Sequence, residues 1–495
     1  MNREGHTPIP LVVRLARELA DAGVVYCHWK SNEALHLSET GENDLDLLVG
    51  RRHVRSFVEV LSRCGFSRVE RRGTPRVPGM DHYFGYDSEA DRFVHIHAHF
   101  QLVLGHDRTK NYRLPIEEAY LASRSIGSVL PVHSAEFEYL VFLIRMVLKY
   151  AIADEIAWNA VRRANGGPSK SEKRELAQLR GLIDSARVSA IIKEHLSFLG
   201  SDILEQAARV VHGEVSRRQG LSVARRLQAR LQPHNRYGPR VDSYMRVVRR
   251  FLVTGRKLAG SRPGYRLAAG GSIIAIIGGD GAGKSTAIEE ITRWLAQHFQ
   301  VRTVHLGKPE RSWTTRVVRG GLRVMAALEG VIGRRKRPGW GDGAPSGPEY
   351  RRMLWYVCKA RDRYLDFRKV RRSANRGEIV ICDRYPHSSL RLMEVPQIER
   401  LTAGGTQTRL ISRLIDIEDR YHRPLVLPDF LAVLKLDPEE AVRRKVEERP
   451  EFVFARSAEV WNAEWDERQV HVIDASKGKD EVVAELKRLI WSSLG

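Results

Sequence analysis

One glycine-rich stretch carries residue types that bind phosphate. Residues 278–286 read GGDGAGKST and fit the pattern G-x-x-x-x-G-K-[ST], whose backbone N–H groups surround phosphate oxygens. In this pattern the lysine, here Lys284, reaches the terminal phosphates, and the hydroxyl of Ser285 is a ligand for Mg²⁺. The sequence therefore predicts a loop for a nucleoside triphosphate, made of Gly278, Gly279, Asp280, Gly281, Ala282, Gly283, Lys284, Ser285 and Thr286.

The residues on both sides of this loop predict the elements that position it. Residues 272–277 (SIIAII) form a short, continuous apolar run, which is typical of a buried parallel strand. After the loop, apolar residues recur at helical spacing at Ile288, Ile291, Leu295 and Phe299. A helix that begins there presents N–H groups and the positive end of its dipole to an anion. A glycine-rich turn without a ligand would explain neither the lysine nor these elements.

A second group of polar residues follows another predicted strand. Asp383 and Arg384 come directly after residues 379–382 (IVIC). Because ligands bind at the carboxyl ends of parallel strands, both side chains are expected to face the phosphates. The carboxylate can hold Mg²⁺, and the guanidinium can neutralise charge on a phosphoryl group in transfer.

Length and composition limit the classes of protein that fit this chain. A chain of 495 residues predicts two or three domains. With 42% hydrophobic residues and no apolar run near twenty, we expect a globular protein in which no segment spans a membrane. The first ten residues lack a secretory pattern, and four scattered cysteines lack metal-type pairing, so a cytoplasmic location is expected.

Three regions are predicted along the chain. Residues 1–125 have the pattern of an α/β domain, residues 126–262 that of a helical, arginine-rich middle region, and residues 268–495 alternate strands with helices. The alternation predicts a parallel sheet flanked by helices, so the fold class is α/β. Its expected strands are 273–277, 301–306, 378–382, 431–436 and 470–473.

The formal charge of +22 is partly concentrated in the middle region. From Val215 to Gly279 the only acidic residue is Asp242, and arginines are frequent. Such a block can contact nucleic acid, an anionic membrane surface or a polyanionic substrate. A solvated helical face is the favoured alternative, since no RNA-binding aromatic signature accompanies the arginines.

The phosphate loop and the later motif VICDRYPHSS together resemble the thymidylate kinase family over roughly residues 270–495. The resemblance implies ATP and Mg²⁺ as cofactors and Lys284, Asp383 and Arg384 as catalytic residues, with Ser285 and Asp383 on the metal. It implies that Tyr385 contacts the acceptor, and it leaves a homodimer open. The segment after Asp437 resembles a lid over ATP, in which Arg444 and Arg449 would contact the nucleotide.

The same resemblance implies an acceptor-phosphate arginine on the helix expected over residues 349–372. Its apolar stripe contains Leu354, Val357 and Leu365. At about 100° per residue, Arg361 falls within this stripe and Arg363 on the opposite side. Arg361 is therefore assigned to the acceptor, and a buried ion pair with an acid of the same domain is the alternative.

The acceptor region departs from the family pattern. Residues 305–309 (HLGKP) stand where the family has a stretch like R-E-P-G-G-T, and Leu390 to Met393 replace part of a base-recognising pocket. The insertion 334–348 is basic and rich in glycine, as in a mobile loop over an acceptor. dTMP is thus the default acceptor, but the rewritten pocket leaves other nucleoside monophosphates or phosphorylated or hydroxyl-bearing small molecules open.

The N-terminal region carries a different motif. Asp44 and Asp46 lie two apart on a predicted strand, which puts both carboxylates on one face, where they can hold a metal. With residues 28–31 (HWKS) before it and 97–100 (HAHF) after it, the motif resembles an uncharacterised bacterial nucleotidyltransferase family. The pattern departs at Ser31, where glycine is expected, and no acid lies on the third strand. There His95, His97 and His99 share one face, as a transition-metal site or as a polar strand face.

Three functions fit these motifs. The leading one is an ATP-dependent phosphotransferase of the thymidylate kinase type, fused to a nucleotidyltransferase-like domain. A nucleotide-gated regulatory or assembly ATPase, docked through the basic middle region, is the second. A nucleotidyltransferase that acts through the Asp44 and Asp46 motif is the third. Transfer of phosphate to an acceptor faster than to water separates the first from the second.

Overall fold

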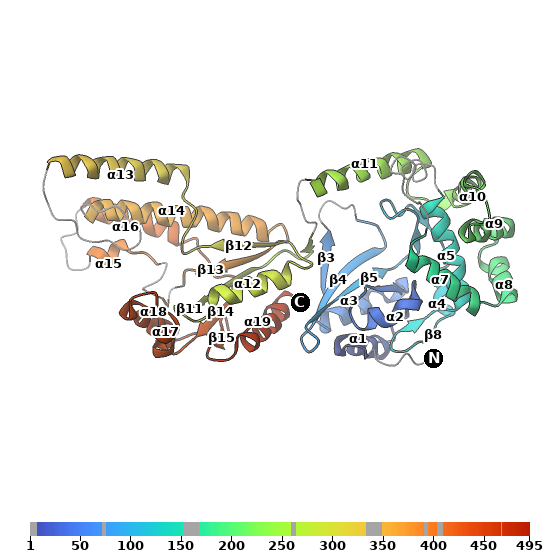
Figure 1. The fold of residues 1–495 in the computed structure, drawn as a ribbon, viewed down its shortest axis with the longest axis horizontal. Helices are drawn as coiled ribbons and strands as arrows, with labels where there is room; N and C mark the ends of the chain where they lie inside the picture. Colours follow the sequence, from blue (N-terminus) through green and yellow to red (C-terminus); the bar gives the residue numbers. More distant parts are fainter. Residues whose placement is uncertain are drawn as a thin grey trace. The chain divides into compact units, whose positions relative to one another are not determined.

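The computed structural model describes residues 7–71, 76–151, 168–258, 264–332, 349–387, 389–390, 395–402, 409–466 and 468–495. The chain forms two compact units, residues 1–263 and residues 264–494 (Figure 1). The expected loop over residues 334–348 and the residues 391–393 lie outside the described residues. Among the described helices, none is both long and apolar enough to cross a bilayer.

The first unit contains a mixed sheet whose strands follow the order β3-β4-β5-β2-β1-β9-β8. These strands are β1 Tyr26–His28, β2 Leu45–Val49, β3 Ser67–Arg71, β4 Met80–Asp87, β5 Arg92–His99, β8 Ser125–Ile126 and β9 Pro131–Val132. β2 pairs with β5 in parallel, whereas β4 runs antiparallel to both β3 and β5. A separate two-stranded ladder joins β6 (Val103–Leu104) to β7 (Tyr112–Arg113).

One face of this sheet packs against two helices, α1 (Pro10–Asp21) and α3 (Val54–Arg63). Leu15 and Phe57 of these helices share one hydrophobic cluster with Leu47 and Ile96 of the sheet. Because side chains alternate along a strand, Asp46 and His97 lie on the other face.

Further helices of the first unit lie between the last strands of the sheet or after them. They are α4 (Glu117–Ala122), α5 (Ala135–Tyr150), α7 (Lys170–Leu182), α8 (Ser185–His195), α9 (Ser201–His212), α10 (Arg217–Arg230) and α11 (Pro239–Leu258). Ser134 caps α5 as its side chain accepts a hydrogen bond from the Phe137 N–H. Ile144, Leu204 and Leu227 of these helices share one hydrophobic cluster with Trp29 and Leu48. The boundary expected near residue 125 therefore lies inside one compact unit.

The arginines of the middle region differ in how far they are exposed. Those of α10 point to solvent, as expected for a solvated helical face; they are Arg217, Arg218, Arg225, Arg226 and Arg230. Arg246 of α11 is instead buried and paired with the carboxylate of Asp242. The acid that interrupts the basic block thus compensates a buried charge.

The second unit contains a sheet of five parallel strands in the order β12-β13-β11-β14-β15. The strands are β11 Ile273–Gly278, β12 Val301–His305, β13 Ile379–Asp383, β14 Phe430–Lys435 and β15 His471–Asp474. A short strand, β10 (Tyr265–Leu267), precedes them. The predicted α/β class with a parallel sheet is confirmed, and each expected strand is present.

Helices cover both faces of this sheet (Figure 1). α14 (Glu349–Ala374) packs Phe367 and Val370 against Ala275 and Val433. α12 (Lys284–Leu295) and α19 (Lys479–Leu494) cover the opposite face and contact each other. The remaining helices are α13 (Trp313–Ile332), α15 (Ile398–Thr402), α16 (Arg409–His422), α17 (Pro438–Arg444) and α18 (Pro450–Asn462).

Candidate functional site

The glycine-rich loop connects the central strand β11 to the first turn of α12. Gly281 and Gly283 have φ values of 80° and 81°, in the left-handed region that favours glycine. A Cβ atom on Gly279 would lie 2.7 Å from the Oγ atom of Ser457 on α18. The loop therefore needs glycine for its dihedral angles and for the close approach of a neighbouring helix.

Lys284 begins α12 and is buried beside the loop. Its Nζ atom donates a hydrogen bond to the carbonyl oxygen of Gly279 at 2.5 Å. Burial lowers the pKa of Lys284 to about 8, and the charge of Asp280 partly offsets this effect. The ammonium group is thus held at the loop and is only weakly solvated, so an anion there would interact with it strongly.

The carboxylate of Asp280 is the acidic centre of this loop. Its side chain is 1% exposed and lies 2.7 Å from the Nη1 atom of Arg456 and 3.4 Å from the Nη2 atom of Arg384. Burial by itself raises the pKa of Asp280, but the hydrogen bond from Arg456 and the charge of Lys284 outweigh it and lower the pKa. Asp280 is therefore ionised at neutral pH and orients two guanidinium groups beside the loop.

Asp383 ends β13, next to the central strand. Its Oδ2 atom lies 3.5 Å from the Nε2 atom of His305, whereas its buried Oδ1 atom accepts no hydrogen bond from the described residues. Burial, and secondarily Arg384, lowers the pKa of His305 although the charge of Asp383 opposes this. An unsatisfied buried carboxylate oxygen and the exposed hydroxyl of Ser285 are both hard oxygen donors, which fit Mg²⁺.

Arg384 has an unusual backbone conformation. Its φ of 57° lies in the left-handed region, which costs a residue with a Cβ atom roughly 1–3 kcal/mol. This conformation is compatible with the ion pair to Asp280 and with a guanidinium that lines the neighbouring cavity. Strain of this kind concentrates at functional sites.

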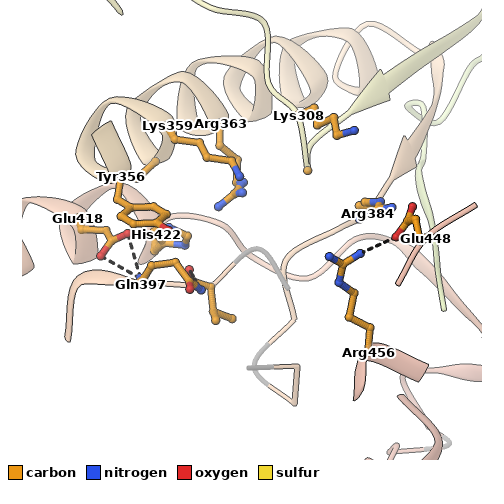
Figure 2. Close-up of a pocket in the computed structure, with 13 residues that line it drawn as sticks. Lys308, Tyr356, Lys359, Arg363, Arg384, Gln397, Glu418, His422, Glu448 and Arg456 are labelled. Atoms are coloured by element: carbon orange, nitrogen blue, oxygen red, sulfur yellow. Dashed lines mark hydrogen bonds and ion pairs between the residues drawn. The ribbon is translucent and has the colours of Figure 1, made fainter. Parts of the chain in front are cut away.

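A cavity of about 340 Å³ lies beside the loop (Figure 2). Five cationic side chains line it: Lys308, Lys359, Arg363, Arg384 and Arg456. The carboxylates that line it belong to Glu418 and Glu448. Arg384 and Arg456, which line the cavity, also form ion pairs with Asp280 of the phosphate loop. The excess of positive charge favours an anionic ligand.

α14 supplies one wall of this cavity and holds the loop after β12. Figure 2 shows Lys359 and Arg363 projecting from this helix into the cavity. The Nε atom of Arg363 donates to the carbonyl oxygen of Leu306 at 2.9 Å. Two turns of the same helix fix the loop further, because Asp362 accepts from the Ser312 hydroxyl at 2.6 Å and Asp366 from the Glu310 N–H at 2.9 Å.

A further part of the lining comes from α16 and from the residues just before α15. The Glu418 carboxylate accepts the N–H group of Gln397 at 3.1 Å (Figure 2). It also accepts the N–H group of Ile398 at 2.9 Å. Burial raises the pKa of Glu418, and the two N–H groups oppose this. Burial, and secondarily Arg363, lowers the pKa of His422 to about 4. His422 is therefore a neutral imidazole at pH 7 and adds no charge to the cavity.

The arginine of α14 at the cavity differs from the one that the sequence assigned to the acceptor. Arg363, not Arg361, lines the cavity. The guanidinium of Arg361 contacts the hydroxyl of Thr314 on α13 instead, and among the described residues it forms no ion pair. Charged residues occupy the buried face of α14: Asp362 and Arg363 are 2% and 3% exposed, whereas Leu354 of the predicted apolar stripe is 37% exposed.

Other predicted contacts also lie elsewhere. Tyr385 is 1% exposed in the hydrophobic core, where its hydroxyl donates to the Val426 carbonyl, so it does not line the cavity. Arg444 pairs with Glu440 at 3.0 Å, and Arg449 is an exposed residue at the start of α18. The arginine of this region that forms an ion pair with the loop is Arg456, about two turns further along α18. The sequence pattern gave no signal for it.

Asp44 and Asp46 lie in the first unit. Asp46 is bound by the Lys30 ammonium at 2.9 Å and by the Nδ1 atom of His97 at 3.2 Å. Asp44 is hydrogen-bonded to the Nδ1 atom of His95 at 2.8 Å. Both carboxylates line a cavity of about 510 Å³ whose basic side chains are Lys30, Lys110, Arg145 and Lys149.

Comparison with known proteins gives distant relatives. Over 223 residues the chain is 27% identical to a thymidylate kinase from Symbiobacterium thermophilum, which covers 44% of this chain and 91% of that protein. It is 26% identical over 181 residues to the uncharacterized ATP-binding protein YghR of Escherichia coli K12, which covers 35% of this chain and 68% of that protein. For the ATP-binding protein YghS of the same strain the identity is 23%, with coverages of 45% and 93%.

Among solved structures, a thymidylate kinase from Candida albicans is 18% identical and covers 46% of this chain and 94% of its own, but its TM-score of 0.30 supports no inference. No family model matches the chain. The chain is therefore distantly similar to thymidylate kinase and to ATP-binding proteins over about 45% of its length. The nucleotidyltransferase-like interpretation of residues 1–125 gains no support from these comparisons.

The charge of Asp280 leads to a testable expectation for the pKa of Lys284. Because the charge of Asp280 raises the pKa of Lys284, we expect Asp280→Asn to move it further below its present value of about 8. The measurement is the reactivity of Lys284 toward an amine reagent as a function of pH, followed by mass spectrometry. Asp416→Asn, on an exposed position of α16, should leave the midpoint unchanged. A midpoint near 10.5 in the unmodified protein would contradict the prediction.

Proposed function

We propose that residues 264–494 bind ATP with Mg²⁺ and transfer the terminal phosphoryl group to an anionic small-molecule acceptor, with a nucleoside monophosphate as the default. The observation that carries this proposal is the cationic cavity directly beside the glycine-rich loop, joined to it through Arg384 and Arg456. A phosphoryl donor and an anionic acceptor would each need positive charge, and the two would need to meet. The arrangement meets both needs.

The proposed donor site consists of the loop and its charged neighbours. Backbone N–H groups of residues 278–286 and the N-terminus of α12 would bind the phosphates, with Lys284 on the terminal groups. Arg384 would neutralise charge that develops on the phosphoryl group in transfer, and Asp280 would hold it in place. Ser285 and Asp383 would hold Mg²⁺, which supplies further neutralisation of phosphate charge.

The proposed acceptor site is the part of the cavity formed by α14, α16 and the loop after β12. Lys308, Lys359 and Arg363 would bind the phosphate of the acceptor. Tyr356, Gln397 and the neutral His422 offer an aromatic ring and hydrogen-bonding groups for the rest of the molecule. The distant thymidylate kinase relative makes dTMP the first acceptor to test.

Transfer of labelled phosphate tests this function directly. The full chain with [γ-³²P]ATP and Mg²⁺ is offered dTMP, dUMP and the other nucleoside monophosphates, and labelled diphosphates are separated by chromatography. We expect transfer to at least one acceptor to exceed release to water and to disappear in Lys284→Ala. Slow release of inorganic phosphate with every acceptor would refute the proposal and favour a nucleotide-gated ATPase.

Two arginines of α14 give a matched pair for the acceptor site. Arg363→Gln should raise the KM for the acceptor about 10- to 150-fold, since a hydrogen bond to a charged group contributes about 1.5–3 kcal/mol. The KM for ATP should change little. Arg361→Gln, whose side chain contacts Thr314 outside the cavity, should leave both constants near their original values. Steady-state kinetics of both variants measures these constants. A larger increase in the acceptor KM for Arg361→Gln than for Arg363→Gln would contradict the placement of Arg363 in the acceptor site.

A further inference from the structure

The face of the first unit's sheet that is not covered by α1 and α3 carries a cluster of imidazole rings. His82 lies on β4, and His95 and His97 lie on β5. His82 and His97 are direct partners in the antiparallel ladder, and His95 is two residues before His97 on the same face. Strand pairing therefore brings three potential metal ligands together.

The rings converge on a small volume. One ligand atom from each of the three histidines lies within 4.8 Å of the others. The centroid of the His97 ring lies 4.6 Å from that of His82 and 4.4 Å from that of His95, and both pairs are edge-to-face. The Nδ1 atom of His82 is 3.3 Å from the Nε2 atom of His95. Imidazole nitrogens at such spacing can share one ion between them.

Two carboxylates contact the rings of this cluster. The Nδ1 atom of His95 contacts Asp44 at 2.8 Å, and the Nδ1 atom of His97 contacts Asp46 at 3.2 Å. Metal-binding histidines usually donate their second ring N–H to such a carboxylate, which fixes the tautomer and the ring orientation. With Nδ1 as the donor in His95 and His97, their Nε2 atoms carry the lone pairs for an ion, and the Nε2 atom of His97 also lies 3.5 Å from Asp44.

We propose that His82, His95 and His97 bind a divalent transition-metal ion, Zn²⁺ or an ion of similar preference, and that Asp44 and Asp46 orient two of the three rings. Imidazole ligands suit Zn²⁺, Co²⁺ and Ni²⁺ better than Mg²⁺, which prefers oxygen. Three protein ligands leave a fourth position for water or a further ligand. The side chains of His95 and His97 are 11% and 19% exposed, so an ion can reach them.

The three histidines of the cluster differ from the set His95, His97 and His99 that the alternating pattern of β5 predicts. His99 does share the face, but it is buried against Trp29, with ring centroids 4.9 Å apart, and lies outside the cluster. His82 replaces it from the neighbouring strand. Asp44 and Asp46 become positioning residues of a nitrogen-ligand site, and the site is separate from the phosphate loop of residues 264–494.

The full chain, prepared without a polyhistidine tag and stripped with a chelator, is titrated with Co²⁺ alone. We expect visible d–d absorption of a nitrogen-ligated ion that saturates at one ion per chain and is displaced by Zn²⁺. His82→Gln and His97→Gln should abolish this absorption. His53→Gln, a histidine in a different element, should retain it. No saturable absorption in the unmodified chain, or equal absorption in the His82 and His97 variants, overturns the proposal.

A second measurement separates loss of the site from loss of the fold. Zn²⁺ should raise the thermal unfolding temperature of the unmodified chain but not of His82→Gln, whose circular dichroism without metal should match the original. Asp44→Asn, which keeps all three imidazoles, should weaken Zn²⁺ binding about 10- to 100-fold. Unchanged affinity in Asp44→Asn would refute the role given to that carboxylate. An equal Zn²⁺ effect on unfolding of His82→Gln would refute the site itself.

Discussion

The buried carboxylate of Asp280 joins distant segments of the second unit through ion pairs. Asp280 lies within the glycine-rich loop, yet its partners come from the end of β13 and from α18. A buried anion is tolerated because Arg456, Arg384 and Lys284 surround it. These cations in turn would repel one another without it. The ion cluster therefore links the loop, the sheet edge and the last third of the unit, and it fixes where positive charge faces the cavity.

The parallel sheet explains why this charge gathers at one edge. The glycine-rich loop, Asp383 and the loop after β12 all follow the carboxyl ends of adjacent strands. α14 then adds Arg363 and anchors that last loop through Asp362 and Asp366. In the first unit the polar side chains lie on a face of the sheet and not at its edge. Histidines of the paired strands β4 and β5 lie there beside carboxylates of β2. The two sheets thus carry different polar groups, with hydroxyl and carboxylate oxygens beside the glycine-rich loop in one unit and imidazole nitrogens on the sheet face in the other.

Local patterns predicted the sheet of the second unit and its glycine-rich loop, because apolar runs and glycine spacing are properties of short segments. Contacts between distant segments were not predictable in this way. Arg363 lines the cavity where Arg361 was expected, because the buried face of α14 carries charged residues. Arg456, which forms an ion pair with Asp280, lies on a helix that has no recognisable motif. His82 lies beside the histidines of β5 because of the register between β4 and β5, which the sequence does not reveal. Tyr385 follows a functional motif but packs in the core, since one residue of a motif can serve the fold alone.

The central claim is that the cationic cavity and the glycine-rich loop form one continuous site for donor and acceptor. A crystal structure with two nucleosides joined by a polyphosphate chain tests it most directly. The account predicts phosphates that run from residues 278–286 past Arg384 to Arg363, with the second nucleoside between α14 and α16. Phosphates bound at the loop with the second nucleoside outside the cavity would contradict it.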